Sequence, residues 1–236
     1  MFDNLSILFP RILDGVPYTV IATVGGIALT IVLSFAAGLG LLASSPVARG
    51  LTRVYVEGFR GTSEVVQLFW IYFALPILVG IDLIPLAAGI IVLGLNHGAY
   101  GAEIVRGAIG SVPRAQYEGA IALNLTPAQR MWRVILPQAV VEMLPSFNNL
   151  FIQLLKSTAL LYFIEVTEIF KQGDILRPQY GDDQELIYLI ELVFYLLLAI
   201  AITMPMRWLE RVAARRVGRS VPSRERALAK VTGGAV

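Results

Sequence analysis

The stretch GVPYTVIATVGGIALTIVLSFAAGLGLLASSPVA, residues 15–48, runs for 34 residues without a charged side chain. The hydrocarbon core of a bilayer is roughly 30 Å thick and an α-helix rises about 1.5 Å per residue, so about 20 apolar residues cross it. This stretch therefore predicts a membrane-spanning helix. The overall composition, 56% hydrophobic and 15% charged residues, agrees with that prediction.

Four further segments of low charge follow along the chain. Segments 65–81 and 83–102 hold 17 and 20 residues without a charge, and segments 134–155 and 186–206 hold 22 and 21 residues with one carboxylate each. We therefore predict an all-α, polytopic membrane protein with five transmembrane helices in a single domain, residues 1–236. The spans are expected near residues 16–43, 54–80, 85–105, 134–160 and 186–206.

The basic residues are distributed unequally between the two sides of these spans. Three lie on one side, at Arg11, Lys171 and Arg177. The positive-inside rule assigns the richer side to the cytoplasm, so the N-terminus is expected outside and the C-terminus inside, with a basic cytoplasmic tail at 207–236 that contacts membrane lipid rather than nucleic acid. The 14 residues of that richer side are Arg49, Arg53, Arg106, Arg114, Arg130, Arg133, Arg207, Arg211, Arg215, Arg216, Arg219, Arg224, Arg226 and Lys230.

The predicted cytoplasmic connection 106–133 contains residues that typically start and end helices, in an order that predicts two short helices joined by a turn. Pro113 suits a first helical turn, and Asn124 suits the left-handed residue that ends a helix. Thr126 and Pro127 then provide a cap and a first-turn proline for a second helix. A loop built in this way is more typical of a docking surface than of a spacer.

The same loop carries a resemblance to a known family, the permeases of binding-protein-dependent ABC importers of the polar amino acid type. The family's loop reads Glu-Ala-Ala, then a glycine, then Leu-Pro; here Glu118, Gly119 and Ala120 precede Asn124 and the pair 136–137. Gly119 replaces the first alanine, which weakens a helix by up to about 1 kcal/mol, and Asn124 replaces the glycine. Further similar stretches are EGFRGTSEVVQLFWIYFALP (57–76, with Ser63 where the family often has proline), GAYGAEIVRGAIGSVP (98–113) and LPSFNNLFIQLLKSTAL (144–160).

The resemblance implies a multi-pass protein of the cell inner (cytoplasmic) membrane that works as part of an assembly. The implied partners are two ATPase subunits, a second permease, identical or paralogous, and an external solute-binding protein. ATP and Mg would be bound by the ATPase, with no cofactor in this chain. The coupling residues would be Arg114, Glu118, Gly119, Ala120, Asn124 and Arg130. Within the family, the chain is most similar to permeases assigned to ectoine and hydroxyectoine uptake.

The fourth predicted span carries a polar stripe. Its members are spaced by four, three, four and three residues and therefore fall on one face of a helix: Glu142, Ser146, Asn149, Gln153 and Lys156. A charge at the bilayer centre costs about 2.5 to 3.5 kcal/mol, so this face should meet protein or water. One interpretation is a solute path offering carboxylate, ammonium and amide groups to a zwitterion. The other is interhelical hydrogen bonding across a dimer interface.

Pro137 and Pro145 are expected to interrupt this span, which slightly favours the path. Other polar residues have structural interpretations. The pairs Glu57–Arg60 and Glu103–Arg106 are spaced for ion pairs on their helices. His97, the only histidine, is interpreted as a packed polar group rather than a metal ligand.

No lysine in the chain follows a glycine, so the Gly-Lys-Ser/Thr end of a nucleotide-binding P-loop is absent. We therefore expect a non-catalytic subunit driven by ATP hydrolysis in another chain. The alternative is an ATP-independent channel or an ion-coupled secondary transporter, in which Glu103, Glu142 and Glu191 would couple ions. A membrane enzyme is a third and less favoured possibility, because no nucleophile, base and orienting group converge in any segment.

Overall fold

The computed structural model describes residues 4–218, and every regular element in that part of the chain is helical. The predicted all-α fold is confirmed for these residues. The helices are α1 (Leu5–Leu13), α2 (Val16–Leu41), α3 (Pro46–Arg60), α4 (Glu64–Phe69), α5 (Leu75–Val79), α6 (Pro85–Gly110), α7 (Arg114–Ala122), α8 (Pro127–Arg130), α9 (Leu136–Ser157), α10 (Ile169–Leu176) and α11 (Gln184–Arg216). Two π-helical turns, Trp70–Ala74 and Met131–Ile135, and two 3-10 turns, Thr158–Ile164 and Gly181–Asp183, connect some of them.

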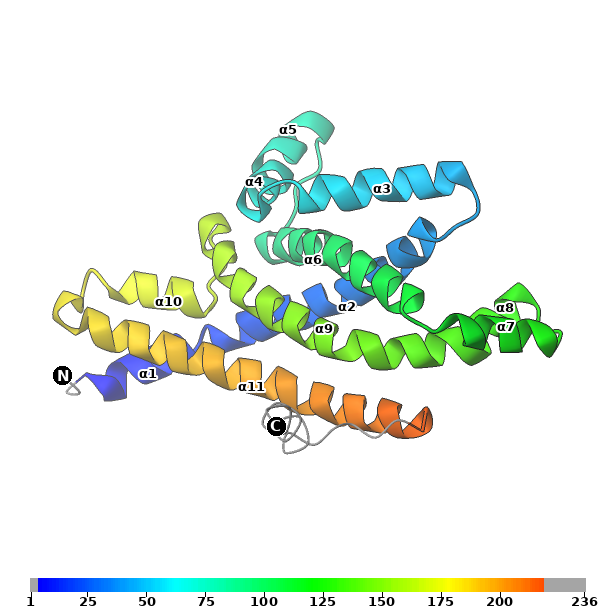
Figure 1. Cartoon of the computed structure of the whole chain (residues 1–236). Helices are drawn as coiled ribbons and strands as arrows, with labels where there is room; N and C mark the ends of the chain where they lie inside the picture. The colour runs from blue at the N-terminus through cyan, green and yellow to red at the C-terminus, as the bar shows by residue number, and fades with distance from the viewer. Residues whose placement is uncertain (1–3, 219–236) are drawn as a thin grey trace, which may run out of the picture.

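The long helices α2, α6, α9 and α11 form a bundle in which the chain runs back and forth (Figure 1). The helices α7 and α8 lie at the end of the bundle where α2, α6 and α11 finish. The helices α1 and α10 lie at the opposite end, beside the start of α11. Within residues 4–218, the start of α3, the α6–α9 connection and the end of α11, which carry most of the basic residues predicted on one side, are gathered at one end of the molecule. Residues 219–236 of the predicted basic tail lie outside the described residues. How the bundle is oriented in a membrane remains the prediction of the positive-inside rule.

The packing of α2 on α6 is the most extensive helix contact, and small residues on both helices make it possible. At Gly38 of α2, an added Cβ would stand 2.6 Å from the Cβ of Val105 and 2.9 Å from the carbonyl oxygen of Ala102, both on α6. Ser34, one turn earlier, donates a hydrogen bond to the carbonyl of Gly98 at 3.4 Å. Small residues allow such a close backbone approach between membrane helices.

Within the described residues, three helices are long and apolar enough to span a membrane: the continuous α1–α2 unit Leu5–Leu41, Pro85–Gly110 and Gly181–Arg216. Two bent helix pairs, Pro46–Arg60 with Glu64–Val79 and Pro127–Ile164 with Ile169–Leu176, raise the number to five if each pair is one span. The structure is therefore compatible with three to five spans. The fourth and fifth predicted spans fall on α9 and α11.

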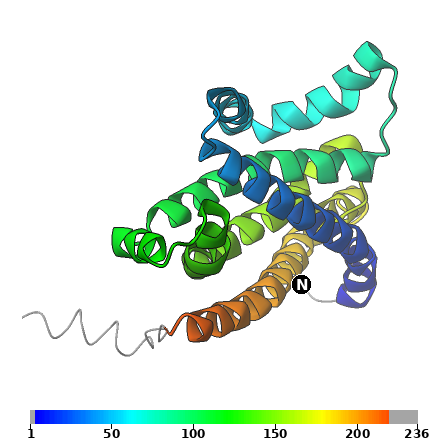
Figure 2. The same ribbon diagram turned by 90° about the vertical axis from the view of Figure 1, so that its right-hand side faces the viewer.

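The predicted span 54–80 is not one straight helix. It begins inside α3 and is broken at residues 61–63, beyond which the chain turns by 105°. Figure 2 shows α3 nearly end-on, with α4 and α5 running sideways from it. Gln67 holds the bend, because its amide nitrogen donates to the carbonyl of Phe59 at 2.8 Å and to the hydroxyl of Thr62 at 2.7 Å.

The predicted interruption at the prolines is only partly right. Pro145 lies inside α9, which continues through it although the proline has no N–H to donate to the preceding turn. Pro137 lies in the first turn of α9, directly after the π turn Met131–Ile135. Pro76 follows the π turn Trp70–Ala74 in the same way. In a regular α-helix, a proline ring clashes with the carbonyl group four residues earlier. At Pro76 and Pro137 that carbonyl belongs to the preceding π-helical turn, which is wider than an α-helical turn.

We expect Gly38→Val to lower the thermal stability of the purified protein, because the new side chain would collide with α6. Forcing extra atoms into a packed interior typically costs 1–3 kcal/mol, about the loss we expect. Tryptophan fluorescence during heating in detergent measures the midpoint. Gly58→Ala is the matched control, since an added Cβ at Gly58 of α3 meets nothing within 4 Å. An unchanged midpoint for Gly38→Val would contradict the close α2–α6 contact.

Candidate functional site

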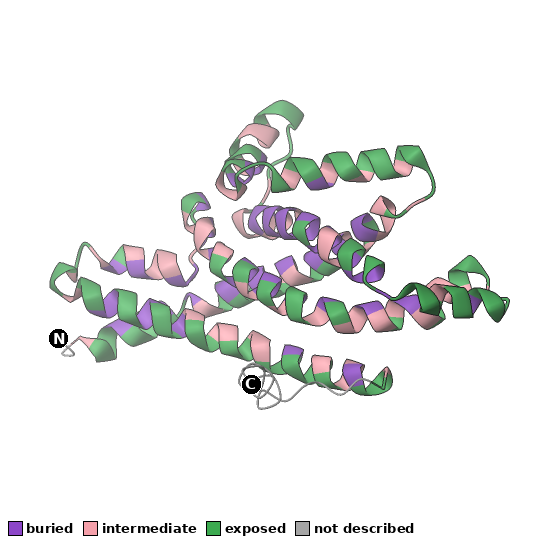
Figure 3. Cartoon of the chain, in the orientation of Figure 1, coloured by how far each residue is buried: buried purple, intermediate pink, exposed green. Residues whose placement is uncertain are grey.

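The structure places the whole polar stripe of α9 on the surface of the chain. Its five residues, Glu142, Ser146, Asn149, Gln153 and Lys156, are all exposed. The opposite side of the same helix is buried and apolar, with Met143, Phe147 and Phe151 in the core beneath α2, α6 and α11. Figure 3 shows α9 with exposed and buried residues alternating along its length. The helix therefore has one face committed to packing and one polar face that this chain leaves uncovered.

A polar face of this kind is costly in contact with lipid tails. Each charge at the bilayer centre costs about 2.5 to 3.5 kcal/mol on insertion scales, and the stripe carries both Glu142 and Lys156. The stripe must therefore meet water or another protein surface. A solute path and a dimer interface both satisfy this requirement, and the two interpretations of the sequence remain open.

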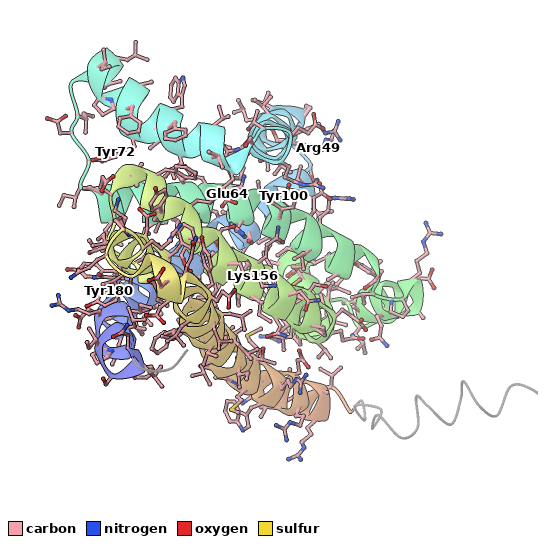
Figure 4. All side chains as sticks on the ribbon, turned by 90° about the vertical axis from the view of Figure 1, so that its left-hand side faces the viewer. Arg49, Glu64, Tyr72, Tyr100, Lys156 and Tyr180 are labelled. Atoms are coloured by element: carbon pink, nitrogen blue, oxygen red, sulfur yellow. The ribbon has the colours of Figure 1, made fainter. Side chains whose placement is uncertain are left out.

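A second polar cluster lies next to the Lys156 end of the stripe, and the sequence did not predict it. Ser157, which follows Lys156, donates a hydrogen bond of 2.9 Å to the carboxylate of Glu64 at the start of α4. The other carboxylate oxygen of Glu64 lies 3.4 Å from Nδ1 of His97 on α6. Figure 4 shows Glu64 and Lys156 on neighbouring elements. The cluster thus joins α4, α6 and α9 beside the exposed stripe.

His97 was interpreted as a packed polar group, and its surroundings fit that interpretation. Its side chain is 1% exposed, and its Nδ1 lies 3.0 Å from the carbonyl oxygen of Leu93. Asn96, next to it, donates to the amide oxygen of Gln67 at 3.0 Å and to the carbonyl of Phe59 at 3.2 Å. The buried polar groups of α6 thereby fix the bend between α3 and α4. Among the described residues, no group of three His, Cys, Asp or Glu side chains is arranged to hold a metal ion.

The predicted ion pairs are half right. Arg106 and Glu103 pair on α6, with Nη2 and Oε2 2.6 Å apart. Glu57, however, pairs with Arg53 one turn earlier at 3.6 Å. Arg60 reaches across to α6, where its guanidinium lies 3.9 Å from Glu103 and 5.2 Å from the ring centre of Tyr100. Arg60 therefore links two helices.

The predicted two-helix turn in the connection 106–133 is confirmed in its local structure. The helix α7 ends before Asn124, which has the predicted left-handed conformation with φ of 55°. Thr126 and Gln129 form a reciprocal capping box at the start of α8. Two orphan backbone donors are satisfied in this way, which makes the turn rigid. We call α7, α8 and their connection the knuckle.

The knuckle presents both charged and apolar side chains to its surroundings. Of the predicted coupling residues, Arg114, Glu118, Gly119 and Asn124 are exposed, Arg130 is half-buried and Ala120 is buried. Ile121 and Leu123 are 54% and 75% exposed, respectively. These two neighbours of Glu118 were not among the residues predicted from the sequence. A signal for them was present, because apolar residues in a polar loop beside Glu118 are typical of a contact surface.

The opposite end of the bundle is held by one buried carboxylate. Glu168, just before α10, accepts hydrogen bonds from the backbone N–H groups of Phe170 (2.9 Å) and Lys171 (2.7 Å) and from the hydroxyl of Tyr195 on α11 (2.7 Å). The N–H of Ile169 donates to the hydroxyl of Thr19 on α2 at 3.2 Å. The helix α10 is thereby fixed to both α2 and α11.

Comparisons with known proteins agree on one kind of protein. Residues 30–219 match the family described as binding-protein-dependent transport system inner membrane component. A relative from Sinorhizobium fredii, the probable amino-acid ABC transporter permease protein y4tF, is 47% identical over 189 residues, which cover 78% of this chain and 79% of the relative. The glutamine transport system permease protein GlnP of Escherichia coli is 34% identical over 204 residues, which cover 86% of this chain and 92% of the relative.

Solved structures show the same architecture. A crystal structure of an amino acid ABC transporter with histidines superposes with a TM-score of 0.80 at 29% identity, covering 89% of this chain and 99% of the other. The MetNI methionine ABC transporter in an inward-facing conformation superposes with a TM-score of 0.73 at 20% identity, covering 86% and 96%. The second match shows the fold alone.

We expect Glu64→Ala to destabilise the protein, because it leaves the Ser157 hydroxyl without its carboxylate partner. Removing one partner of a buried polar pair typically costs about 1–3 kcal/mol. Glu64→Gln is the matched control, since it keeps the side-chain volume and an oxygen that accepts from Ser157. The midpoint of thermal unfolding in detergent should fall clearly more for alanine than for glutamine. Equal midpoints for wild type and Glu64→Ala would show that the cluster does not support the fold.

Proposed function

Because the chain belongs to the family of binding-protein-dependent transport system inner membrane components, we propose that it is the permease subunit of an ATP-driven importer and that the polar stripe of α9 forms part of its solute path. The exposed stripe is the observation that carries this proposal. This face of a membrane helix cannot contact lipid tails without a large cost in free energy. It offers an ammonium, a carboxylate and amide groups along one line. A zwitterionic solute needs such groups.

The proposed solutes are amino acids or amino-acid-like compatible solutes, with ectoine and hydroxyectoine as candidates. The relatives support the broader class, since their names refer to amino acids, L-cystine and glutamine. The ectoine candidate rests on the sequence resemblance alone. Binding of ectoine and of polar amino acids to the cognate external binding protein, measured by calorimetry, tests the choice directly. Tight binding of a polar amino acid and none of ectoine would remove the ectoine candidate.

The proposed energy source is a pair of ATPase subunits that bind ATP and Mg and dock on the knuckle. This sequence has no P-loop, so the energy of ATP hydrolysis has to be transmitted to it from another subunit through a contact surface. The exposed Glu118, Ile121 and Leu123 on a capped, rigid turn form such a surface. A second permease copy, identical or paralogous, and an external binding protein complete the proposed assembly. Closure of the ATPases would then move the two permeases between inward-open and outward-open states.

Uptake into vesicles that contain the whole assembly, with and without internal ATP, separates this function from its alternative. An importer of this kind requires internal ATP. Uptake by this chain that is indifferent to nucleotide would instead favour the ATP-independent channel or ion-coupled transporter.

We expect Asn149→Ala to reduce ATP-dependent uptake at least severalfold, because it removes an amide from the centre of the stripe. Glu142→Gln should act in the same direction. Asn148→Ala is the matched control, since Asn148 is the same residue type at the same depth and its buried side-chain oxygen has no hydrogen-bond partner to lose. ATPase assembly, followed by co-purification, should be unaffected. Normal uptake kinetics in both stripe variants would exclude the stripe from the solute path.

We expect Glu118→Arg to weaken binding of the ATPase subunit at least tenfold, the effect usual for reversing a charge within a contact surface. Glu57→Arg is the matched control, a charge reversal at an exposed position of α3 outside the knuckle. Co-purification and ATPase stimulation measure the effect. If Glu118→Arg binds the ATPase as wild type does, the knuckle is not the docking surface.

A further inference from the structure

An apolar groove runs between α9 and α11 on the side of α9 away from the polar stripe. It consists of two adjoining cavities of about 380 and 150 Å³. They share Val140 and Leu144 of α9 and Leu209 of α11. The larger cavity lies at the end of α11 and is lined there by Trp208, Ala213 and Arg216. We call the two cavities together the α9–α11 groove.

The groove continues toward the middle of the bundle. The smaller cavity reaches Phe35 of α2 and Phe151 of α9. One turn further along the same helices, a third cavity of about 210 Å³ is lined by Val24, Leu155 and Ile202. The line of apolar cavities therefore follows the seam of α9 and α11 from the end of the bundle inward. Its shape and chemistry fit a hydrocarbon chain.

The end of the groove near the end of α11 carries one arginine and one tryptophan. Arg216 lines it, whereas Arg207, Arg211 and Arg215 lie on the same final turns of α11 but do not line the cavity. Trp208, 58% exposed, lines it as well. Tryptophan favours the level of the lipid headgroups, and a basic pocket between membrane helices at the cytoplasmic side suits an anionic headgroup. The predicted orientation puts this end of the bundle at the cytoplasmic side.

We propose that the α9–α11 groove binds an anionic phospholipid of the cytoplasmic leaflet. The acyl chain lies along Val140, Leu144 and Leu209, and the phosphate lies against the guanidinium of Arg216. Charge complementarity favours this occupant over a second copy of the chain, because a symmetric copy would bring another set of these arginines toward the same basic end. The lipid packs on the back of α9, directly opposite the stripe proposed to carry solute.

The test uses Trp208 as a reporter. The chain has three tryptophans, so Trp70→Phe with Trp132→Phe leaves Trp208 alone in the full-length protein. In phosphatidylcholine vesicles, phosphatidylglycerol with brominated acyl chains should quench Trp208 at several-fold lower mole fraction than brominated phosphatidylcholine. Quenching requires contact with the brominated chain, so this preference reports occupancy of the groove and not transport.

Two substitutions locate the effect. Arg216→Gln should raise the mole fraction of brominated phosphatidylglycerol for half-quenching about fivefold, the effect of one basic residue near an anionic lipid. Arg216→Lys should keep most of the preference. Ala213→Phe, which fills the groove, should abolish it. Arg49→Gln, at an exposed arginine of α3 away from the groove, is the control and should match the parent.

Several results would overturn the proposal. Equal quenching by the two brominated lipids would mean that the groove has no preference for the anionic headgroup. A parent-like curve for Arg216→Gln would remove the assigned phosphate contact. Weak quenching by both lipids, combined with a change of oligomeric mass in Ala213→Phe, would identify the groove as a contact between copies of the chain.

Discussion

The cost of placing a polar group in hydrocarbon is the constraint on which this structure depends. Lipid tails offer no hydrogen bonds and stabilise no charge, so every polar side chain at membrane depth must face protein or water. The helix α9 meets this constraint by dividing its surface into two faces. One face is apolar and packs against α2, α6 and α11, and the other carries Glu142, Lys156 and the amides between them. The polar face of such a helix has to contact water or another protein surface.

The remaining elements position that helix. The helices α2 and α6 pack closely together and support α9. At Gly38 their backbones approach so closely that a larger residue would collide with α6. Buried hydrogen bonds then attach the bent α3–α4 segment to α6, through Gln67 and Asn96. Glu64 and Ser157 connect the same bend to the end of α9. The polar stripe is thus held by contacts that lie outside it.

The sequence predicted the long helices and the knuckle well, because apolar length and capping residues are local properties of the chain. Asn124 and Thr126 take the conformations that their residue types favour. The bend at 61–63 was not predicted, since it depends on hydrogen bonds from Gln67 and on Asn96, which is far away in the sequence. Glu64 was missed for the same reason, and Arg60 was assigned to the wrong carboxylate because its partner lies on another helix. The exposure of all five stripe residues agrees with their helical spacing in the sequence. The role of the stripe in transport is a proposal.

The carboxylate of Glu168 has a mechanical consequence. Since it bonds to the start of α10 and to Tyr195 of α11 while Ile169 is bonded to Thr19 of α2, these three helices share a single buried joint. The short helix α10 cannot swing out by itself without breaking the bond from Tyr195 to Glu168 and the bond from Ile169 to Thr19. Any opening at this end of the bundle must therefore carry the tips of all three helices together as one body.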